Sequence, residues 1–312
     1  MRVLIVKPSS LGDVVHGLRV IAQAKGIGPD LNVDWVIKRG LAGILDASNI
    51  INKIFFYDRG KGFFRYANLA AKIRRRNYDF ILDMQGLIRS AFLVKLAKGG
   101  RKLGRADGRE FSTLFYDSIG EKDRSIRIHA IDRMLPFLTA LGISGFDESL
   151  PLQFSGSSLN AKLKKLLLGK KNVLLFPESR RKEKVWPFFK DLVKMLSSDR
   201  RFRVVVAGAE SQQNEFSESL DLRGKLSLNE LPALVGHADL VVSNDSAPLH
   251  VASAMGRPSV SLFGPTDPVL YGPYPADSDD SVVLHAPSRK IEDLKINTVY
   301  RAVAEKLGQA NA

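Results

Sequence analysis

Residues 1–13 of the chain read MRVLIVKPSSLGD. Residues 3–6 are all apolar, and the lysine and proline that follow end the run. A short apolar run that is stopped in this way predicts a buried strand over residues 2–6. Ser9, Ser10 and Gly12 then favour a turn, and a helix is expected to begin near Asp13. Strand, polar turn and helix are together the repeating unit of parallel sheets covered by helices.

This alternation continues along the whole chain. We expect further strands at residues 33–37, 54–57, 80–84, 173–176, 202–207, 240–243 and 259–263. Helical periodicity occurs at residues 14–24, 64–75, 87–96, 130–141, 188–196, 212–220, 228–235, 248–255 and 291–307. A polar stretch at 155–158 divides the pattern, which predicts two doubly wound, Rossmann-like α/β domains at 1–155 and 156–312. Because ligands bind beyond the carboxyl ends of such strands, we expect the site in a cleft between facing domains.

Length and composition fit two soluble domains of ordinary size. With 312 residues, 45% of them hydrophobic, the chain is too long for one small core. No apolar run approaches the roughly 20 residues of a membrane-spanning helix, and the opening stretch lacks the length and cleavage site of a signal peptide. The absence of cysteine excludes disulfides and thiolate nucleophiles and fits a reducing compartment. We therefore expect a cytoplasmic protein.

The chain is strongly basic, with a formal net charge of +14 at pH 7 and a pI near 9.9. An anionic partner follows: a nucleic acid, a phosphorylated small molecule or a surface of acidic lipid. A nucleic-acid-binding protein is the alternative of another class, but the sequence shows no recognisable binding module and no platform of aromatic and basic residues. An NAD-dependent dehydrogenase is a weaker alternative, because no Gly-x-Gly-x-x-Gly follows the first strand.

The loop after the first strand is the first candidate site. Ser9, Ser10 and Gly12 present small side chains and backbone amides near a helix N-terminus, which suits an anion or a sugar that bears one. Asp13 at this junction is placed to act as a general base that removes a proton from an attacking hydroxyl. The alternative is that Asp13 caps the helix.

Cationic residues crowd the corresponding loop of the second half, where the sequence runs FPESRRKEKVWP at residues 176–187. An anion such as a diphosphate would relieve their mutual repulsion. Lys184 is a candidate to neutralise the charge that develops on a departing nucleotide diphosphate, which needs no metal. The alternative is a solvated charged loop.

A third segment, NDSAPLH at residues 244–250, follows an apolar strand and opens a helix. Ser246 and Ala247 would present unpaired backbone amides that stabilise a phosphate. Asp245 is expected either to bind a sugar hydroxyl or to cap the helix. His250 is either a core histidine or a residue of the cleft.

Six ordered segments together resemble the heptosyltransferases of glycosyltransferase family 9 along nearly the full length. They are VKPSSLGDV at 6–14, DMQGL at 83–87, RE at 109–110, KVWP at 184–187, NDSAPLH at 244–250 and FGPTDP at 263–268. The likeness is greatest to the members that add the first heptose to the Kdo of lipid A.

The resemblance implies a GT-B fold in which the N-terminal domain holds the acceptor and the C-terminal domain holds ADP-heptose. It also implies that the last helix packs back on the N-terminal domain. Asp13 resembles the family's catalytic base and Lys184 its diphosphate-neutralising lysine. The implied donor-binding residues are Ser9, Ser10, Gly12, Ser179, Gln212, Leu226, Asp245, Ser246, Ala247 and His250. The implied acceptor-binding residues are Arg59, Lys61, Gln85 and Arg109.

Two positions depart from the family pattern. Gln212 replaces a glutamate of the nearest relatives, and Ser246 with Ala247 replaces the usual threonine and glycine. A transferase of this family that uses another nucleotide sugar or acceptor is therefore the alternative function. A nucleotide-sugar-binding pseudoenzyme is less well supported, because both Asp13 and Lys184 are present.

We expect an inverting glycosyltransferase that needs no cofactor and no metal, because Asp279 and Asp280 lie in a polar loop and form no Asp-x-Asp motif at the site. Cationic residues crowd the first domain and suit an anionic acceptor of the lipid A–Kdo type. The alternative is that many of them only solvate helix faces. The same charge suits peripheral association with the cytoplasmic face of the inner membrane, a partnership we expect in place of nucleic acid.

Overall fold

The structure is a computed structural model that describes residues 1–27, 30–58, 60, 62–209 and 216–309. It divides the chain into two compact units, Met1–Asp147 and Glu148–Ala312. The division lies shortly before the boundary we expected after residue 155. The reason is that the connecting segment is tied to the second unit, where the Leu152 N–H donates to the Ala254 carbonyl oxygen at 2.6 Å.

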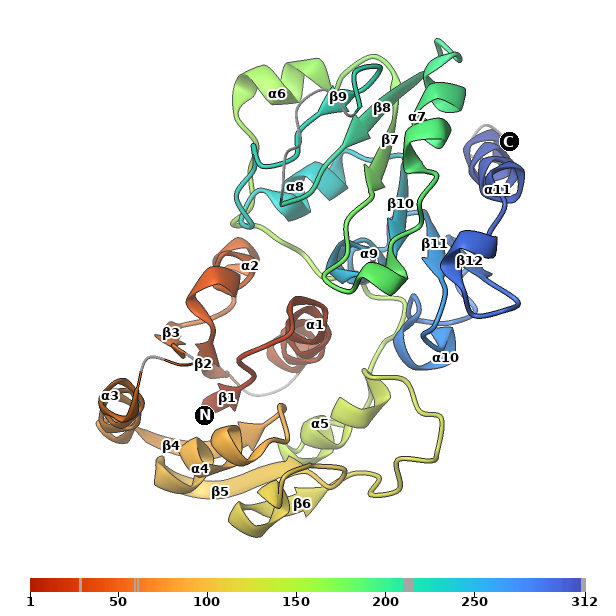
Figure 1. Cartoon of the computed structure of the whole chain (residues 1–312). Coiled ribbons are helices and arrows are strands. Elements are labelled where there is room, and N and C mark those ends of the chain that lie inside the picture. Colours follow the sequence, from red (N-terminus) through yellow and green to blue (C-terminus); the bar gives the residue numbers. More distant parts are fainter. Residues whose placement is uncertain (28–29, 59, 61, 210–215, 310–312) are drawn as a thin grey trace. The chain divides into compact units, whose positions relative to one another are not determined.

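The first unit is a six-stranded parallel sheet in the order β3-β2-β1-β4-β5-β6 (Figure 1). Its strands are β1 (Arg2–Val6), β2 (Asn32–Ile37), β3 (Lys53–Phe56), β4 (Asn77–Asp83), β5 (Lys98–Arg105) and β6 (Asp117–Ile119). Its helices and 3-10 turns are α1 (Leu11–Ile27), η1 (Arg39–Leu41), α2 (Gly43–Ser48), α3 (Phe63–Arg74), α4 (Ile88–Leu96), η2 (Ser112–Phe115), η3 (Asp132–Met134) and α5 (Pro136–Ala140). Contacts pair α1 with α5 and α3 with α4, on opposite faces of the sheet. The strand order reverses between β1 and β4, which is where a doubly wound sheet binds its ligand.

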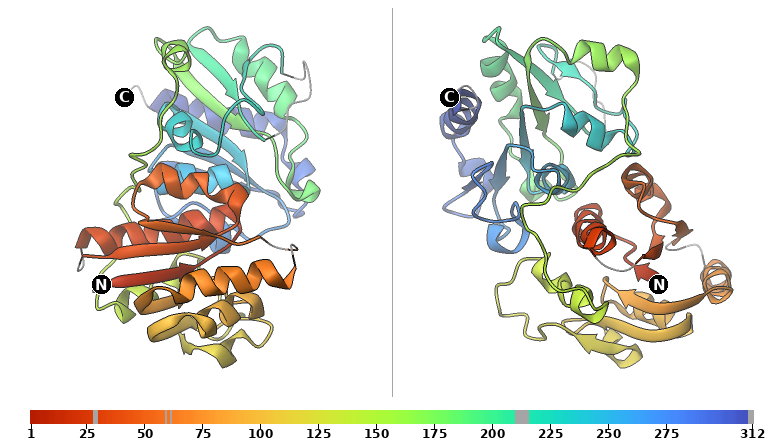
Figure 2. Two further views of the ribbon diagram at one scale, coloured as in Figure 1. Left: turned by 90° about the vertical axis from the view of Figure 1, so that its left-hand side faces the viewer. Right: turned by 180° about the vertical axis from the view of Figure 1, so that it is seen from behind.

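The second unit repeats this plan with the strand order β12-β11-β10-β7-β8-β9. Its strands are β7 (Lys171–Phe176), β8 (Phe202–Val206), β9 (Leu220–Asp221), β10 (Leu240–Asn244), β11 (Ser259–Phe263) and β12 (Ser281–His285). Its helices and 3-10 turns are α6 (Ala161–Leu166), η4 (Lys182–Lys184), α7 (Phe189–Ser197), α8 (Leu231–Gly236), α9 (Ala247–Ala254), α10 (Pro268–Tyr271), η5 (Ile291–Asp293) and α11 (Ile296–Gln309). Figure 2 shows α7 with α11 and α8 with α9 on the two sides of this sheet. The order reverses between β7 and β10.

Strand β5 is the main element that the sequence pattern missed. Its sequence, KGGRKLGR, has too many charges and glycines to read as a strand. A Cβ atom at Gly99 would overlap the backbone of Tyr78, and one at Gly100 would lie 2.5 Å from the Asp79 carbonyl oxygen. The glycines therefore allow β5 to pair closely with β4, a tertiary requirement that periodicity does not reveal.

Three expected helices also differ. The one expected at 291–307 is divided into η5 (Ile291–Asp293) and α11 (Ile296–Gln309). The helix expected at 130–141 is instead η3 followed by the short α5, because Pro136 has no N–H to continue an α-helix. The one expected at 212–220 falls largely outside the described residues, and its described end leads into β9.

The final helix α11 packs within the second unit. It contacts α7, β10 and β11, and Val299, Val303 and Leu307 are buried in that unit's core. These contacts are all within the second unit, and the expected packing of this helix on the N-terminal domain stays a prediction. Across the described part of the chain, no helix is both long and apolar enough to cross a membrane.

Candidate active site

Asp13 lies in the first turn of α1, at the end of the loop that leaves β1. Its Oδ2 accepts hydrogen bonds from the backbone N–H of Ser10 at 2.9 Å and from the Ser10 hydroxyl at 2.6 Å. The bond to the N–H is the reciprocal half of a capping box, because α1 begins at Leu11, two residues before the expected start, so Asp13 is its third residue and not its N-cap. Among the described residues Oδ1 has no hydrogen-bond partner, and the side chain is 35% exposed. Asp13 therefore caps the helix through one carboxylate oxygen only.

Lys7 sets the charge state of Asp13. The Lys7 ammonium is buried, and its Nζ lies 3.9 Å from Asp13 Oδ2. Burial acts to raise the pKa of Asp13, but the Lys7 charge and the Ser10 hydrogen bonds outweigh it and hold that pKa well below its usual range. Burial in turn lowers the pKa of Lys7, with Asp13 opposing the shift. At neutral pH Asp13 is thus an ionised carboxylate that can accept a hydrogen bond from a hydroxyl.

Three hydrogen bonds fix the loop between β1 and α1. The Trp35 indole donates to the Lys7 carbonyl oxygen at 3.1 Å, and the Lys38 N–H donates to the Pro8 carbonyl oxygen at 3.1 Å. The Ser9 N–H donates to Gln85 Oε1 at 3.2 Å. The structure therefore brings together Ser9 and Gln85, which we had assigned to different substrates.

Asp83, the last residue of β4, holds the loop that carries Gln85. It is fully buried, and its Oδ1 accepts from the N–H groups of Gln85 at 2.9 Å and Gly86 at 3.0 Å. Its Oδ2 accepts from the Ser90 hydroxyl at 2.9 Å. Burial raises the pKa of Asp83 to about 6, although these hydrogen bonds and the Lys7 charge oppose the shift. The motif at 83–87 was noted from the sequence, but nothing in it singled out Asp83 as the residue that shapes the loop.

Asp83→Ala is expected to lower the free energy of unfolding by about 2–4 kcal/mol, because three hydrogen bonds are lost in a buried site. Asp83→Asn keeps an acceptor for the two backbone N–H groups and is expected to lose less. Urea denaturation of the three proteins measures both differences.

The raised pKa of Asp83 also predicts how the free energy of unfolding depends on pH. The folded-state pKa of Asp83, about 6, lies above the ~3.9 of an unfolded chain, so the folded state binds the proton more tightly. The wild type should therefore lose free energy of unfolding relative to Asp83→Asn as the pH rises from about 4 to about 7. A difference that does not change between these pH values would contradict the raised pKa.

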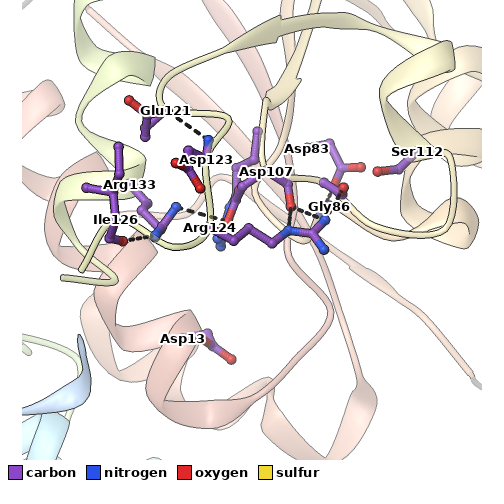
Figure 3. Close-up of polar contacts among 12 residues, drawn as sticks. Asp13, Asp83, Gly86, Asp107, Ser112, Glu121, Asp123, Arg124, Ile126 and Arg133 are labelled. Carbon is purple, nitrogen blue, oxygen red and sulfur yellow. Dashed lines mark hydrogen bonds and ion pairs between the residues drawn. The ribbon is translucent and has the colours of Figure 1, made fainter. Parts of the chain in front are cut away.

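A cluster of arginines surrounds Asp107 in the loop after β5 (Figure 3). Arg105 donates from Nε and Nη2 to the two Asp107 carboxylate oxygens, at 2.8 and 2.6 Å, and Arg133 Nη1 lies 3.4 Å from Oδ2. Arg124 donates to the Asp107 carbonyl oxygen at 2.9 Å. Burial acts to raise the pKa of Asp107, but the arginines outweigh it and lower that pKa. Sequence reasoning missed this cluster, because a run of charges reads as a solvated surface.

Of the four predicted acceptor-binding residues, Gln85 and Arg109 are among the described residues. The Arg109 side chain is exposed, and its N–H donates to the Gly86 carbonyl oxygen at 2.8 Å, so the Gln85 and Arg109 loops are tied together. Arg59 and Lys61 lie outside the described residues.

In the second unit Lys184 and Asp245 form an ion pair. Lys184 follows β7 in η4, Asp245 follows β10, and Lys184 Nζ lies 2.5 Å from Asp245 Oδ2. The Thr266 hydroxyl, from the loop after β11, donates to the same oxygen at 2.5 Å. Asp245 is 5% exposed and its N–H donates to the Leu262 carbonyl oxygen at 3.0 Å. Three loops therefore meet at one carboxylate oxygen, and Thr266 is a member that sequence reasoning did not identify.

Asn244 links the same loops through its amide side chain. Its Oδ1 accepts from the Trp186 N–H at 3.0 Å, and its Nδ2 donates to the Pro177 carbonyl oxygen at 2.9 Å. The loop that carries Lys184 is thereby fixed against the end of β10.

Helix α9 begins directly after this cluster. Ser246 is the N-cap residue with extended backbone, and its side chain makes no capping hydrogen bond. Its hydroxyl lies 3.2 Å from that of Ser243 instead. Ser246 and Ala247 are half-buried, and His250 is buried one turn further on.

Two further predicted donor residues follow strands of the same sheet, Ser179 after β7 and Leu226 after β9. Glu178 Oε2 accepts from the Ala209 N–H at 2.8 Å, and a Cβ atom at Gly208 would overlap the Glu178 carboxylate. Ser179 and Leu226 are half-buried, and Gln212 lies outside the described residues. Over the described ranges, no group of three or more His, Asp or Glu side chains is arranged to hold a metal ion.

Two doubly wound units, with polar residues gathered beyond the carboxyl ends of their strands, have the plan of the GT-B fold, which many glycosyltransferases share. The sequence profile of glycosyltransferase family 9 (heptosyltransferase) matches residues 66–302. The chain therefore belongs to glycosyltransferase family 9 and is an enzyme. The family resemblance carried by the six motifs is confirmed.

Individual relatives match over nearly the whole chain. Lipopolysaccharide heptosyltransferase 1 of Escherichia coli strain K12 is 29% identical, over 98% of this chain and 99% of the relative. The solved structure of E. coli heptosyltransferase WaaC with ADP is 27% identical, with a TM-score of 0.81 over 98% of this chain and 100% of that one. The structure of E. coli ADP-heptose lps heptosyltransferase II has a TM-score of 0.79 at 19% identity, which bears on the fold alone. The predicted fold class is confirmed.

Proposed function

We propose that this chain transfers a heptose from ADP-heptose to a Kdo or heptose hydroxyl of the lipopolysaccharide inner core. The supporting observation is that the chain is similar to lipopolysaccharide heptosyltransferase 1 along its length and carries polar clusters at both strand-order reversals. A family 9 transferase with another nucleotide sugar is the alternative, favoured by Gln212 and by Ser246 with Ala247.

The second unit is proposed to bind the donor. The diphosphate would lie at the N-terminus of α9, where the amides of Ser246 and Ala247 and the helix dipole favour an anion. Lys184 would add a positive charge there. The ribose would lie near Gly208 and the adenine near Leu226. The other proposed donor contacts are Ser9, Ser10, Gly12, Ser179, Gln212, Asp245 and His250.

Asp13 is proposed to be the general base. The attacking hydroxyl of the acceptor would donate to Asp13 Oδ1, which has no partner among the described residues, and pass its proton there as the new bond to the anomeric carbon forms. ADP leaves from the opposite face with inversion of configuration. Lys184 would stabilise the departing diphosphate, so the lysine supplies the charge that a metal ion supplies elsewhere.

The first unit is proposed to bind the acidic acceptor. It carries 25 of the 47 lysine and arginine residues but only 14 of the 33 acidic residues. Arg109 and Gln85, with Arg59 and Lys61, are the proposed contacts to acceptor carboxylates and phosphates. The same charge supports a proposed peripheral association with the cytoplasmic face of the inner membrane.

Calorimetric titration is the direct test of the donor. We expect ADP to bind more tightly than UDP or GDP, and to bind equally well with and without a chelator. A preference for UDP or GDP would leave the fold assignment unchanged and contradict ADP-heptose as the donor. Loss of ADP binding in chelator would overturn the proposed role of Lys184 in place of a metal.

A further inference from the structure

One surface of the first unit exposes apolar side chains that neither proposed substrate site uses. Phe111 is 80% exposed and Leu114 is 77% exposed, and both lie on the turn that contains η2. Phe92 of α4 is also exposed. We call Phe92, Phe111 and Leu114 the apolar face.

The turn that carries Phe111 and Leu114 packs along α4, the helix that carries Phe92. At one end Glu110 Oε2 accepts from the Ile88 N–H at 3.2 Å. At the other end the Phe115 ring meets the Phe92 ring edge-on, with centroids 6.1 Å apart. Phe111 and Leu114 lie between these two attachments.

The turn is held in an unusual backbone conformation that leaves Phe111 exposed. Glu110 and Phe111 have left-handed φ values of 57° and 59°, which side chains other than glycine, asparagine and aspartate rarely adopt. The Ser112 N–H donates to the Arg109 carbonyl oxygen at 3.0 Å and closes the turn. An exposed phenylalanine kept at some conformational cost suggests a function outside the fold itself.

Cations border the apolar face. Along α4 the exposed stripe is Arg89, Phe92 and Lys95, so one cation lies about a turn to each side of the phenylalanine. Between residues 62 and 116 the sequence has 12 lysines and arginines but only four acidic residues. Of those four, Asp83 is buried and Asp107 is paired with arginines.

We propose that Phe111, Leu114 and Phe92 insert into the interfacial layer of a bilayer rich in anionic lipid, while Arg89 and Lys95 contact its headgroups. Apolar side chains flanked by cations match such an interface, because the rings enter the acyl boundary and the long cationic side chains extend to the phosphates. This deepens the proposed function, on which it rests: a lipid-borne acceptor would be met at the surface in which it lies.

Fluorescence gives a direct readout of insertion. The two native tryptophans, Trp35 and Trp186, are both fully buried, so a tryptophan introduced as Phe111→Trp is the exposed emitter. With phosphatidylglycerol-rich vesicles we expect its emission to shift to the blue and to be quenched by lipids brominated in the acyl chains. The matched control is Leu168→Trp, at a position in the second unit that is 66% exposed, and it should show neither change.

The affinity for these vesicles measures how much the apolar face contributes to membrane binding. Phe111→Ser with Leu114→Ser should weaken binding to these vesicles by about 100-fold, since burying each side chain contributes roughly tenfold in affinity. Leu166→Ser with Leu168→Ser is the control and should bind like the wild type.

The outcomes separate this inference from the proposed function. Transfer to a deacylated, water-soluble acceptor should be unchanged in the Phe111→Ser, Leu114→Ser variant, and transfer to an acceptor embedded in vesicles should fall. Vesicle binding without a blue shift at position 111 would mean headgroup attraction only and would overturn insertion. Wild-type self-association that the serine variant abolishes, without any vesicle binding, would assign the face to a second copy and also overturn it. Inactivity of the wild type on the soluble acceptor, with insertion intact, would instead count against the proposed function.

Discussion

Replacing Asp13 by asparagine is expected to lower turnover by about 10²–10⁴, with ADP bound nearly as well as by the wild type. The substitution keeps an oxygen that can accept the Ser10 N–H and hydroxyl, so the N-terminus of α1 remains capped. It removes the negative charge that would receive the proton of the attacking hydroxyl. Turnover at saturating ADP-heptose and acceptor measures the loss.

Asp13→Ala tests the proposed role of Asp13 as a base separately from its role in capping the helix. It should lose turnover to the same extent and in addition lower the free energy of unfolding by about 1 kcal/mol, because the capping hydrogen bonds are lost. If Asp13→Asn kept more than a tenth of the wild-type turnover while Asp13→Ala lost only stability, Asp13 would be a helix cap and the base would have to be sought elsewhere.

The sequence was sufficient for the parts of the site that are local in the chain. Ser10 and Asp13 are three residues apart at a strand-to-helix junction that the pattern predicts, although the helix begins two residues earlier than expected and Asp13 caps it from the third helical position. The first strand is apolar throughout its interior, and its buried place in the sheet follows equally directly.

Contacts between distant loops could not be predicted in this way. Lys184 and Asp245 are 61 residues apart, and they meet because β7 and β10 are neighbours in the sheet. Thr266 joins them because β11 is next to β10. The motifs indicated that these loops carry function, but only the strand order places Asp245 against the lysine.

Lys184→Ala is expected to weaken ADP binding and turnover together, by about 10²–10³ in turnover, which is the usual effect of removing one preorganised electrostatic contact. The substitution takes a positive charge from the proposed diphosphate site and leaves the buried Asp245 carboxylate there without its cation. That carboxylate then repels the diphosphate. The substitution should weaken the binding of AMP, which lacks the second phosphate, less than it weakens the binding of ADP. Calorimetry with both nucleotides measures the difference.

The double variant Lys184→Ala with Asp245→Asn distinguishes a role in binding from a role in stability. If Lys184 faces the diphosphate, removing the opposing carboxylate should restore ADP affinity by about tenfold over Lys184→Ala but leave turnover well below that of the wild type. If the ion pair is only structural, Lys184→Ala should lower the free energy of unfolding by about 3–5 kcal/mol, the cost of leaving a buried charge unpaired, and the double variant should recover it. Across the two variants, ADP affinity would then fall and recover together with the free energy of unfolding, whatever the charge at the site. Unchanged ADP affinity in a folded Lys184→Ala protein would contradict the proposed contact, because the pair would then lie away from the diphosphate.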